Sequence, residues 1–148
     1  MAAIDLTNLT KMFGSVRAVN SLTLSIPDKE FVALLGPSGC GKTTTMNMIA
    51  GIEQPTSGSI CFNGVDVGDA PPGRRGIGFV FQNYAIFTHM TVRANLAFGL
   101  EIRREPPGEI ARKVTEMAAL MRLSDKLDRA AVRLNVNEMQ RLAIGRSA

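Results

Sequence analysis

The chain has 148 residues, of which 45% are hydrophobic and 5% aromatic, and its 17 basic residues exceed its 13 acidic residues by 4. This length and composition are those of a single globular domain and exclude a fibrous or disordered chain, while two cysteines are too few for a disulfide framework. The basic excess lies in residues 91–148, with 11 basic against 7 acidic residues, but without long basic runs or interleaved aromatic residues, so we expect no nucleic-acid partner.

Two features bear on where the chain resides. No apolar stretch approaches the roughly 18 residues that a membrane helix needs, and residues 1–5 lack the basic start and apolar run of a signal peptide. We therefore expect a cytosolic protein in which Cys40 and Cys61 are free thiols, since neither has the spacing of a metal ligand.

Strands are predicted in the first part of the chain, where short apolar runs are separated by glycine and proline. Apolar and polar residues alternate over 4–9 and 22–26, which predicts two strands of a half-exposed antiparallel layer. Residues 31–35 are continuously apolar and predict a strand buried on both faces. Further strand-like runs lie at 58–62 and 77–81.

Helical patterns occur in three segments. Residues 42–50 contain no helix breaker and are followed by Gly51, a residue favoured just after a helix end. A second helix begins after the breaker at 106–108, and a shorter one lies around 139–143. Along the second helix, apolar residues recur on one face, which we interpret as core packing. These residues are Ile110, Val114, Met117 and Met121.

The strongest motif is a glycine-rich loop at residues 36–43, GPSGCGKT, which matches G-x-x-x-x-G-K-[ST] at every fixed position. Such loops hold the phosphates of a nucleotide because backbone N–H groups converge where glycines leave room. We expect Lys42 to place its charge between the terminal phosphates, Thr43 to bind Mg²⁺ and Thr44 to donate to an inner phosphate. Cys40 lies in the same loop, either as a reactive thiol or as a small filler.

Further segments resemble the ATPases of ABC transporters. The stretch KMFG at 11–14 resembles their adenine-stacking loop, and GFVFQNYAIF at 78–87 resembles their Q-loop region. PPGRRG at 71–76 and HMTVRANLAFGL at 89–100 resemble the branch that serves sugar and glycerol-phosphate importers. The resemblance covers essentially the whole chain.

The resemblance implies roles that the loop motif does not identify. Phe13 would stack on adenine, at a position where the family often has Tyr; the alternative is an ordinary core aromatic. Gln82 would reach Mg²⁺ and the attacking water. Residues 84–98 would begin a helical subdomain, and His89 is expected to be structural or interfacial. The expected nucleotide contacts are Phe13, Gly36, Pro37, Ser38, Gly39, Cys40, Gly41, Lys42, Thr43, Thr44 and Gln82, with Thr43 and Gln82 as the expected Mg²⁺ ligands.

The sequence departs from the family in the signature L-S-G-G-Q, which caps the γ-phosphate bound to a partner subunit. The aligned residues are Leu134, Asn135, Val136, Asn137 and Glu138, so both glycines are lost. Val136 resists the backbone freedom of glycine, and Glu138 would bring negative charge toward the phosphate, so we expect a weakened composite site. Either the partner is a different ATPase with an intact signature, or the degenerate segment still functions in a homodimer.

A second departure concerns hydrolysis, which in the family requires an apolar strand that ends in Asp and is followed by a Glu that polarises water. The sequence contains no such run, because the candidate at 60–66 is broken by Asn63 and Gly64. We therefore assign no catalytic residue and expect a chain that is truncated before this Walker B strand and is inactive alone.

We expect an α/β phosphate-loop NTPase fold of the ABC type: a mixed sheet with an N-terminal antiparallel layer, plus a helical subdomain. The expected parts are a nucleotide-binding core over 1–90, with the phosphate loop and Q-loop, and a helical subdomain over 91–148. The expected function is ATP binding and hydrolysis that drives import of a sugar, polyol or glycerol-phosphate-like solute. The alternatives are a non-catalytic or regulatory nucleotide-binding module and an inactive fragment.

The resemblance also implies partners and a location. ATP and Mg²⁺ would be the cofactors, and a second ATPase subunit would bind the nucleotide that faces Asn135, Val136, Asn137 and Glu138. A membrane permease subunit would dock near Tyr84 to Met90, or these apolar residues would belong to the local core. The protein would then lie on the inner face of the cell membrane.

Overall fold

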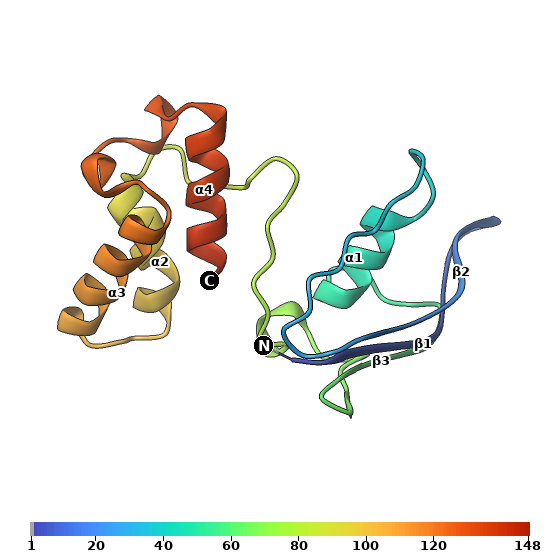
Figure 1. Ribbon diagram of the computed structural model, residues 1–148. Coiled ribbons are helices and arrows are strands. Elements are labelled where there is room, and N and C mark those ends of the chain that lie inside the picture. Colours follow the sequence, from blue (N-terminus) through green and yellow to red (C-terminus); the bar gives the residue numbers. More distant parts are fainter. Residues whose placement is uncertain (1) are drawn as a thin grey trace. The chain divides into compact units, whose positions relative to one another are not determined.

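The computed structural model describes residues 2–148 and divides the chain into two compact units, Met1–Ile77 and Gly78–Ala148 (Figure 1). The first unit is a sheet with one helix, and the second is a group of helices. None of the helices in the described part of the chain is long and apolar enough to cross a membrane.

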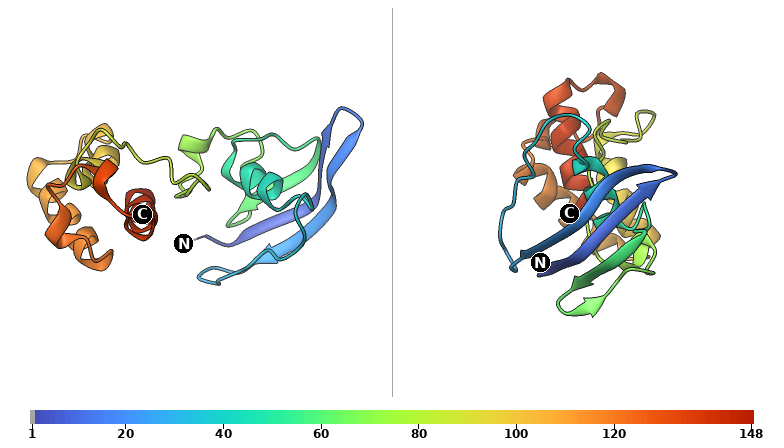
Figure 2. Two further views of the ribbon diagram at one scale, coloured as in Figure 1. Left: turned by 90° about the horizontal axis from the view of Figure 1, so that it is seen from above. Right: turned by 90° about the vertical axis from the view of Figure 1, so that its right-hand side faces the viewer.

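The sheet of the first unit has four antiparallel strands in the order β2-β1-β3-β4 (Figures 1 and 2). The strands are β1 (Ile4–Phe13), β2 (Val16–Ile26), β3 (Ser57–Phe62) and β4 (Val65–Asp66). In β1, Leu6 lies opposite Leu24 of β2 and Ile60 of β3, so apolar side chains gather on one face. The antiparallel layer and the strand near 58–62 are thus confirmed.

Helix α1 (Lys42–Ala50) packs against this sheet, through Met48 and Ile49, which are buried among the core residues of β1 and β3. It ends at Gly51, whose φ of 76° is left-handed and whose N–H bonds to the carbonyls of Asn47 and Met48. The helix predicted over 42–50 is therefore confirmed at both ends. The core of this unit contains Leu6, Leu9, Val19, Met48, Ile49, Ile60 and Phe62.

Two predicted strands do not form in the described residues. The runs 31–35 and 77–81 adopt no regular structure, and Phe31 and Leu35 are 94% and 91% exposed. A continuously apolar run forms a strand when neighbouring strands pair with it and both its faces are covered. No strand of the described sheet lies beside either run, so the predictions of a buried strand at 31–35 and of a strand at 77–81 are wrong for this structure.

The second unit contains three helices, α2 (Val92–Ile102), α3 (Pro107–Leu120) and α4 (Val136–Ser147). The short 3₁₀ turns η2 (Ser124–Lys126) and η3 (Ala131–Arg133) lie between α3 and α4. The turn η1 (Pro72–Arg74) belongs to the first unit. The apolar face predicted for α3 is confirmed, because Val114 is 2% exposed and Met117 packs against the same core. That core contains Val92, Leu96, Ala97, Val114, Ala118, Leu123, Ala131, Leu134 and Leu142.

Candidate functional site

The glycine-rich loop passes close to strand β2, and this approach requires glycine. Gly41 has a left-handed φ of 91°, and a Cβ on it would lie 2.4 Å from the carbonyl oxygen of Ala18. Gly39 is also left-handed, with a φ of 82°. The predicted loop therefore has the backbone conformation that its glycines allow, and it leads directly into α1.

The side chain of Lys42 folds back into the loop. Its Nζ donates to the carbonyl oxygens of Gly36 and Pro37, both at 2.7 Å, and lies 3.3 Å from Sγ of Cys40. These contacts place the ammonium group inside the curve of the loop, where its acceptors are neutral. Phosphate oxygens are stronger acceptors for an ammonium than neutral carbonyls, so an anion that entered the loop would compete well for Lys42.

The N-terminus of α1 is open to an anion. Its N-cap is Gly41, so no side chain caps the first turn, and the first turn contains no acidic residue. The first helical hydrogen bond runs from the N–H of Thr45 to the carbonyl of Gly41, at 2.8 Å. The earlier N–H groups, including those of Thr43 and Thr44, therefore add to the positive end of the helix dipole. Thr43 is exposed and Thr44 half-buried.

Phe13 lies at the end of β1, in the same unit as the loop, and its side chain is 48% exposed. The Nζ of Lys11 lies 4.9 Å from the centroid of the Phe13 ring. The same Nζ forms an ion pair with Oε1 of Glu53, at 2.6 Å. The ring is therefore not a core aromatic in this structure. Its exposed part is available for stacking, which stays a prediction.

The N-terminus of α4 is closed, in contrast to that of α1. The side chain of Asn135 accepts from the N–H of Glu138, and the Glu138 carboxylate accepts from the N–H of Asn135, both at 3.0 Å. The same carboxylate pairs with Lys126 at 2.7 Å, and Glu138 is 7% exposed. This reciprocal capping box uses donors that an anion would otherwise bind.

This arrangement corrects one expectation. We expected Glu138 to bring its charge toward a bound phosphate, but its carboxylate is buried against Lys126 and the helix end. The hydrogen bond from Lys126, together with that from the Asn135 N–H, holds the pKa of Glu138 below its ordinary value. The exposed residues at this end are Asn135, Val136 and Asn137.

Comparisons with known proteins identify the family of the chain. Residues 19–148 match the sequence family described as ABC transporter. The chain belongs to the ABC transporter family. It is 46% identical over 147 residues to the sn-glycerol-3-phosphate import ATP-binding protein UgpC 2 of Rhizobium johnstonii, covering 99% of the chain and 43% of that protein. It is 48% identical over 149 residues to the sulfate/thiosulfate import ATP-binding protein CysA of Pectobacterium atrosepticum, covering 98% of the chain and 45% of that protein.

The fold is also similar to that of solved ABC ATPase domains. A crystal structure of a nucleotide-free ATP-binding cassette from an ABC transporter superposes with a TM-score of 0.83 at 25% identity, over 99% of the chain and 64% of that structure. The chain therefore spans less than half the length of the curated relatives and about two thirds of the cassette. The ABC-type α/β fold expected from the sequence is confirmed. The expected mixed sheet is not, because every strand pair of the described sheet is antiparallel.

Two predicted regions of the ABC family lie in the second unit. Gln82 is exposed in a turn, and its role at a metal shared with Thr43 stays a prediction. In the segment near Tyr84 to Met90, Phe87 lies 4.5 Å from Phe98, ring centroid to centroid. The fully buried Asn95 bonds to both the N–H and the carbonyl of Phe87, at 2.9 Å each. Part of this segment is thus local core, while Thr88 and His89 are exposed.

Arg75 was not singled out by the sequence, yet it holds the first unit together. Its guanidinium donates to four backbone carbonyls: Ala70, Gly68, Met48 and Ile49, at 2.8 to 3.0 Å. The last two belong to the C-terminal end of α1, where a cation complements the helix dipole. The sequence offers no signal for this role, because the neighbouring Arg74 has the same side chain and is exposed.

Proposed function

We propose that this chain is the ATP-binding part of an ABC importer ATPase subunit. The observation that carries the proposal is the open N-terminus of α1, with Lys42 folded into a glycine loop and no acidic residue in the first turn. Backbone N–H groups, a helix dipole and one lysine together suit the polyphosphate of a nucleotide. Phe13 is available to stack on the adenine ring.

Thr43 and Gln82 lie in different units, and each has a side chain of a kind that Mg²⁺ can bind. The hydroxyl of Thr43 and the side-chain oxygen of Gln82 are hard oxygen ligands of the kind that Mg²⁺ takes alongside water and phosphate. Both residues are exposed, so neither is committed to the core. The ion would neutralise charge on the phosphates. Lys42 and the α1 N–H groups would hold and orient the phosphate tail.

We further propose that the intact protein hydrolyses ATP and drives solute import with a membrane permease, on the inner face of the cell membrane. Relatives named as importer ATP-binding proteins for glycerol-3-phosphate, sulfate or thiosulfate, spermidine or putrescine, and alpha-glucosides support this proposal. Their identities to the chain all lie between 44% and 48%, so similarity does not select one solute. The exposed residues near Tyr84 to Met90 are the proposed permease contact.

The closed N-terminus of α4 bears on the second ATPase subunit. Because Asn135 and Glu138 cap each other, this helix offers fewer free N–H groups to the nucleotide of a partner than α1 offers to its own. We therefore propose pairing with a different ATPase whose own signature completes the site at Lys42. Two equally active sites in an obligate homodimer would contradict this proposal.

A second candidate function, a non-catalytic or regulatory nucleotide-binding module, is also favoured by the closed α4. It shares the ATP-binding step with the first candidate and differs only in turnover. Phosphate release from MgATP, measured on the protein with its partner ATPase, distinguishes the two functions.

The nucleotide proposal is tested by titrating MgATP into the chain and measuring binding by calorimetry. Lys42→Ala removes the ammonium inside the loop, and we expect at least a tenfold loss of affinity. Lys29→Ala is the matched control, because Lys29 is an exposed lysine of the same unit outside the loop. Equal affinities for the two variants would overturn the proposed role of the loop.

A further inference from the structure

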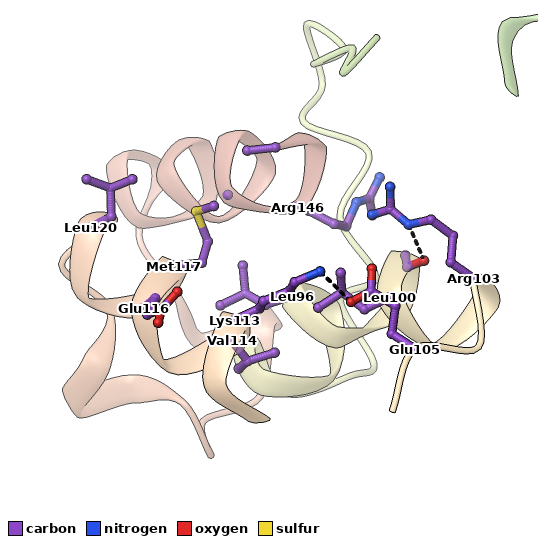
Figure 3. Close-up of a pocket in the computed structure, with 13 residues that line it drawn as sticks. Leu96, Leu100, Arg103, Glu105, Lys113, Val114, Glu116, Met117, Leu120 and Arg146 are labelled. Carbon is purple, nitrogen blue, oxygen red and sulfur yellow. Dashed lines mark hydrogen bonds and ion pairs between the residues drawn. The ribbon is translucent and has the colours of Figure 1, made fainter. Parts of the chain in front are cut away.

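A cavity in the second unit carries an inference that does not involve the nucleotide. It has a volume of about 420 Å³ and lies between α2, α3 and the C-terminal end of α4 (Figure 3). This size is within the usual range for small-molecule sites. None of its lining residues belongs to the phosphate loop or to the other proposed nucleotide contacts.

The walls of the cavity combine apolar and charged side chains. Leu96 and Leu100 come from α2, and Val114, Met117 and Leu120 come from α3. On the α4 side, Gly145 lets the helix approach closely, because a Cβ there would lie 3.0 to 3.1 Å from Met121, Leu96 and Met117. An apolar body would therefore be covered on several sides.

One cation of the wall has no anionic partner. The Nη1 atom of Arg146 is buried and has no hydrogen-bond partner among the described residues. The guanidinium carbon lies 4.6 Å from the ring centroid of Phe87, a cation–π contact that fixes the group without neutralising it. Burial lowers the pKa of Arg146, but an arginine stays charged at neutral pH.

The other charges of the wall do not satisfy Arg146. Glu105 pairs with Lys113, and Glu116 pairs with Arg112 at 2.8 Å. Arg103 donates only to the carbonyl of Gly99, at 3.2 Å, among the described contacts. Figure 3 shows Arg103 and Arg146 reaching toward the same end of the cavity. Among the described residues, two arginines without acidic side-chain partners therefore line a space whose two side-chain carboxylates are already paired.

We propose that this cavity binds a small apolar carboxylic acid, with its carboxylate on Arg146 and its apolar body against Leu96, Val114 and Met117. Arginine matches a carboxylate because its planar fork can donate two parallel hydrogen bonds.

The test uses 4-phenylbutyrate as the probe, with the chain labelled at its methionine methyl groups for NMR. Met117 lines the cavity, and Met12 in β1 of the other unit is the internal reference. We expect a saturable shift of the Met117 signal and none of Met12. The neutral 4-phenyl-1-butanol should bind at least tenfold more weakly. Equal or tighter binding of the alcohol, or no saturable shift with 4-phenylbutyrate, would overturn the proposal.

Variants assign the effect to the arginine. Arg146→Leu should reduce the affinity for 4-phenylbutyrate at least tenfold, whereas Arg133→Leu, an exposed arginine outside the cavity, should leave it unchanged. Arg146→Leu should also unfold at the same or a higher temperature without the probe, because it removes a charge that lacks a partner. A lower unfolding temperature combined with unchanged probe affinity would give Arg146 a purely structural role and contradict the site.

Discussion

Single residues at the N-termini of α1 and α4 determine how each helix can meet an anion. At α1, the N-cap Gly41 has no side chain, and the following Lys42 adds a positive charge. At α4, the N-cap Asn135 and the carboxylate of Glu138 occupy the end of the helix. Because backbone N–H groups can bind either a side chain or a ligand, only α1 keeps its first turn free for phosphate.

The capping side chain of α4 can be tested against a matched neighbour. Asn135→Ala removes the acceptor for the Glu138 N–H, and we expect the free energy of unfolding of the helical unit to fall by about 1 kcal/mol. Asn137→Ala changes an exposed asparagine that does not cap the helix, and it should change the free energy by less than about 0.5 kcal/mol. Urea unfolding followed by circular dichroism measures both. Equal losses would show that the capping box contributes nothing specific.

The pH dependence of stability tests the buried Glu138 pair. The pKa of Glu138 is lowered, mainly by the hydrogen bond from Lys126, so its stabilising effect is fully present above the unfolded value near 4.5. This effect is lost as the pH falls through the lower pKa of the folded state. Relative to Glu138→Gln, the chain should therefore be more stable at pH 7, and the difference should shrink below about pH 4.5. A difference that is constant from pH 7 to pH 2 would contradict the pair.

At the scale of elements, the sequence predicts best where structure is decided locally. The helix over 42–50 is flanked by a glycine loop and ends at Gly51, so its bounds follow from short-range rules. The runs 31–35 and 77–81 fail because a buried strand depends on neighbours that a local pattern does not contain.

Within the candidate site, the sequence likewise predicts residues whose positions are fixed by a local pattern, but not contacts that depend on tertiary packing. The loop motif predicts Lys42 and Thr43 because their positions in it are fixed by the pattern. The pairing of Glu138 with Lys126 depends on how η2 packs beside the start of α4, and no spacing rule predicts it. The difference between buried Arg75 and exposed Arg74 likewise depends on tertiary packing.

The hydrogen bonds from Arg75 to the C-terminal end of α1 can be tested with this adjacent pair of arginines. Arg75→Ala removes donors to four carbonyls, two of them in α1, and should lower the free energy of unfolding of the first unit by about 2 to 4 kcal/mol. Arg74→Ala, at an exposed position, should lower it by less than about 0.5 kcal/mol. Denaturant unfolding of both variants measures the difference. Similar losses in the free energy of unfolding would show that the Arg75 hydrogen bonds do not stabilise the first unit.

At the scale of the whole molecule, the described chain joins an antiparallel sheet unit that carries the glycine-rich loop to a helical unit that carries residues 134–138. It spans 43% of a glycerol-3-phosphate importer relative and 64% of a solved cassette. The glycine-rich loop, α1 and Phe13 all lie within the first unit. We therefore expect this unit to bind ATP by itself.

Backbone amide NMR of the chain during a MgATP titration tests this central claim most directly. We predict saturable shifts that are largest at residues 36–44, which form the loop and the first turn of α1, with no significant change at residues 107–120 of α3. The Lys42→Ala variant should lose these shifts at the same MgATP concentration. Unchanged amide signals at 36–44, or larger shifts in α3 than in the loop, would contradict the assignment of this loop as the nucleotide site.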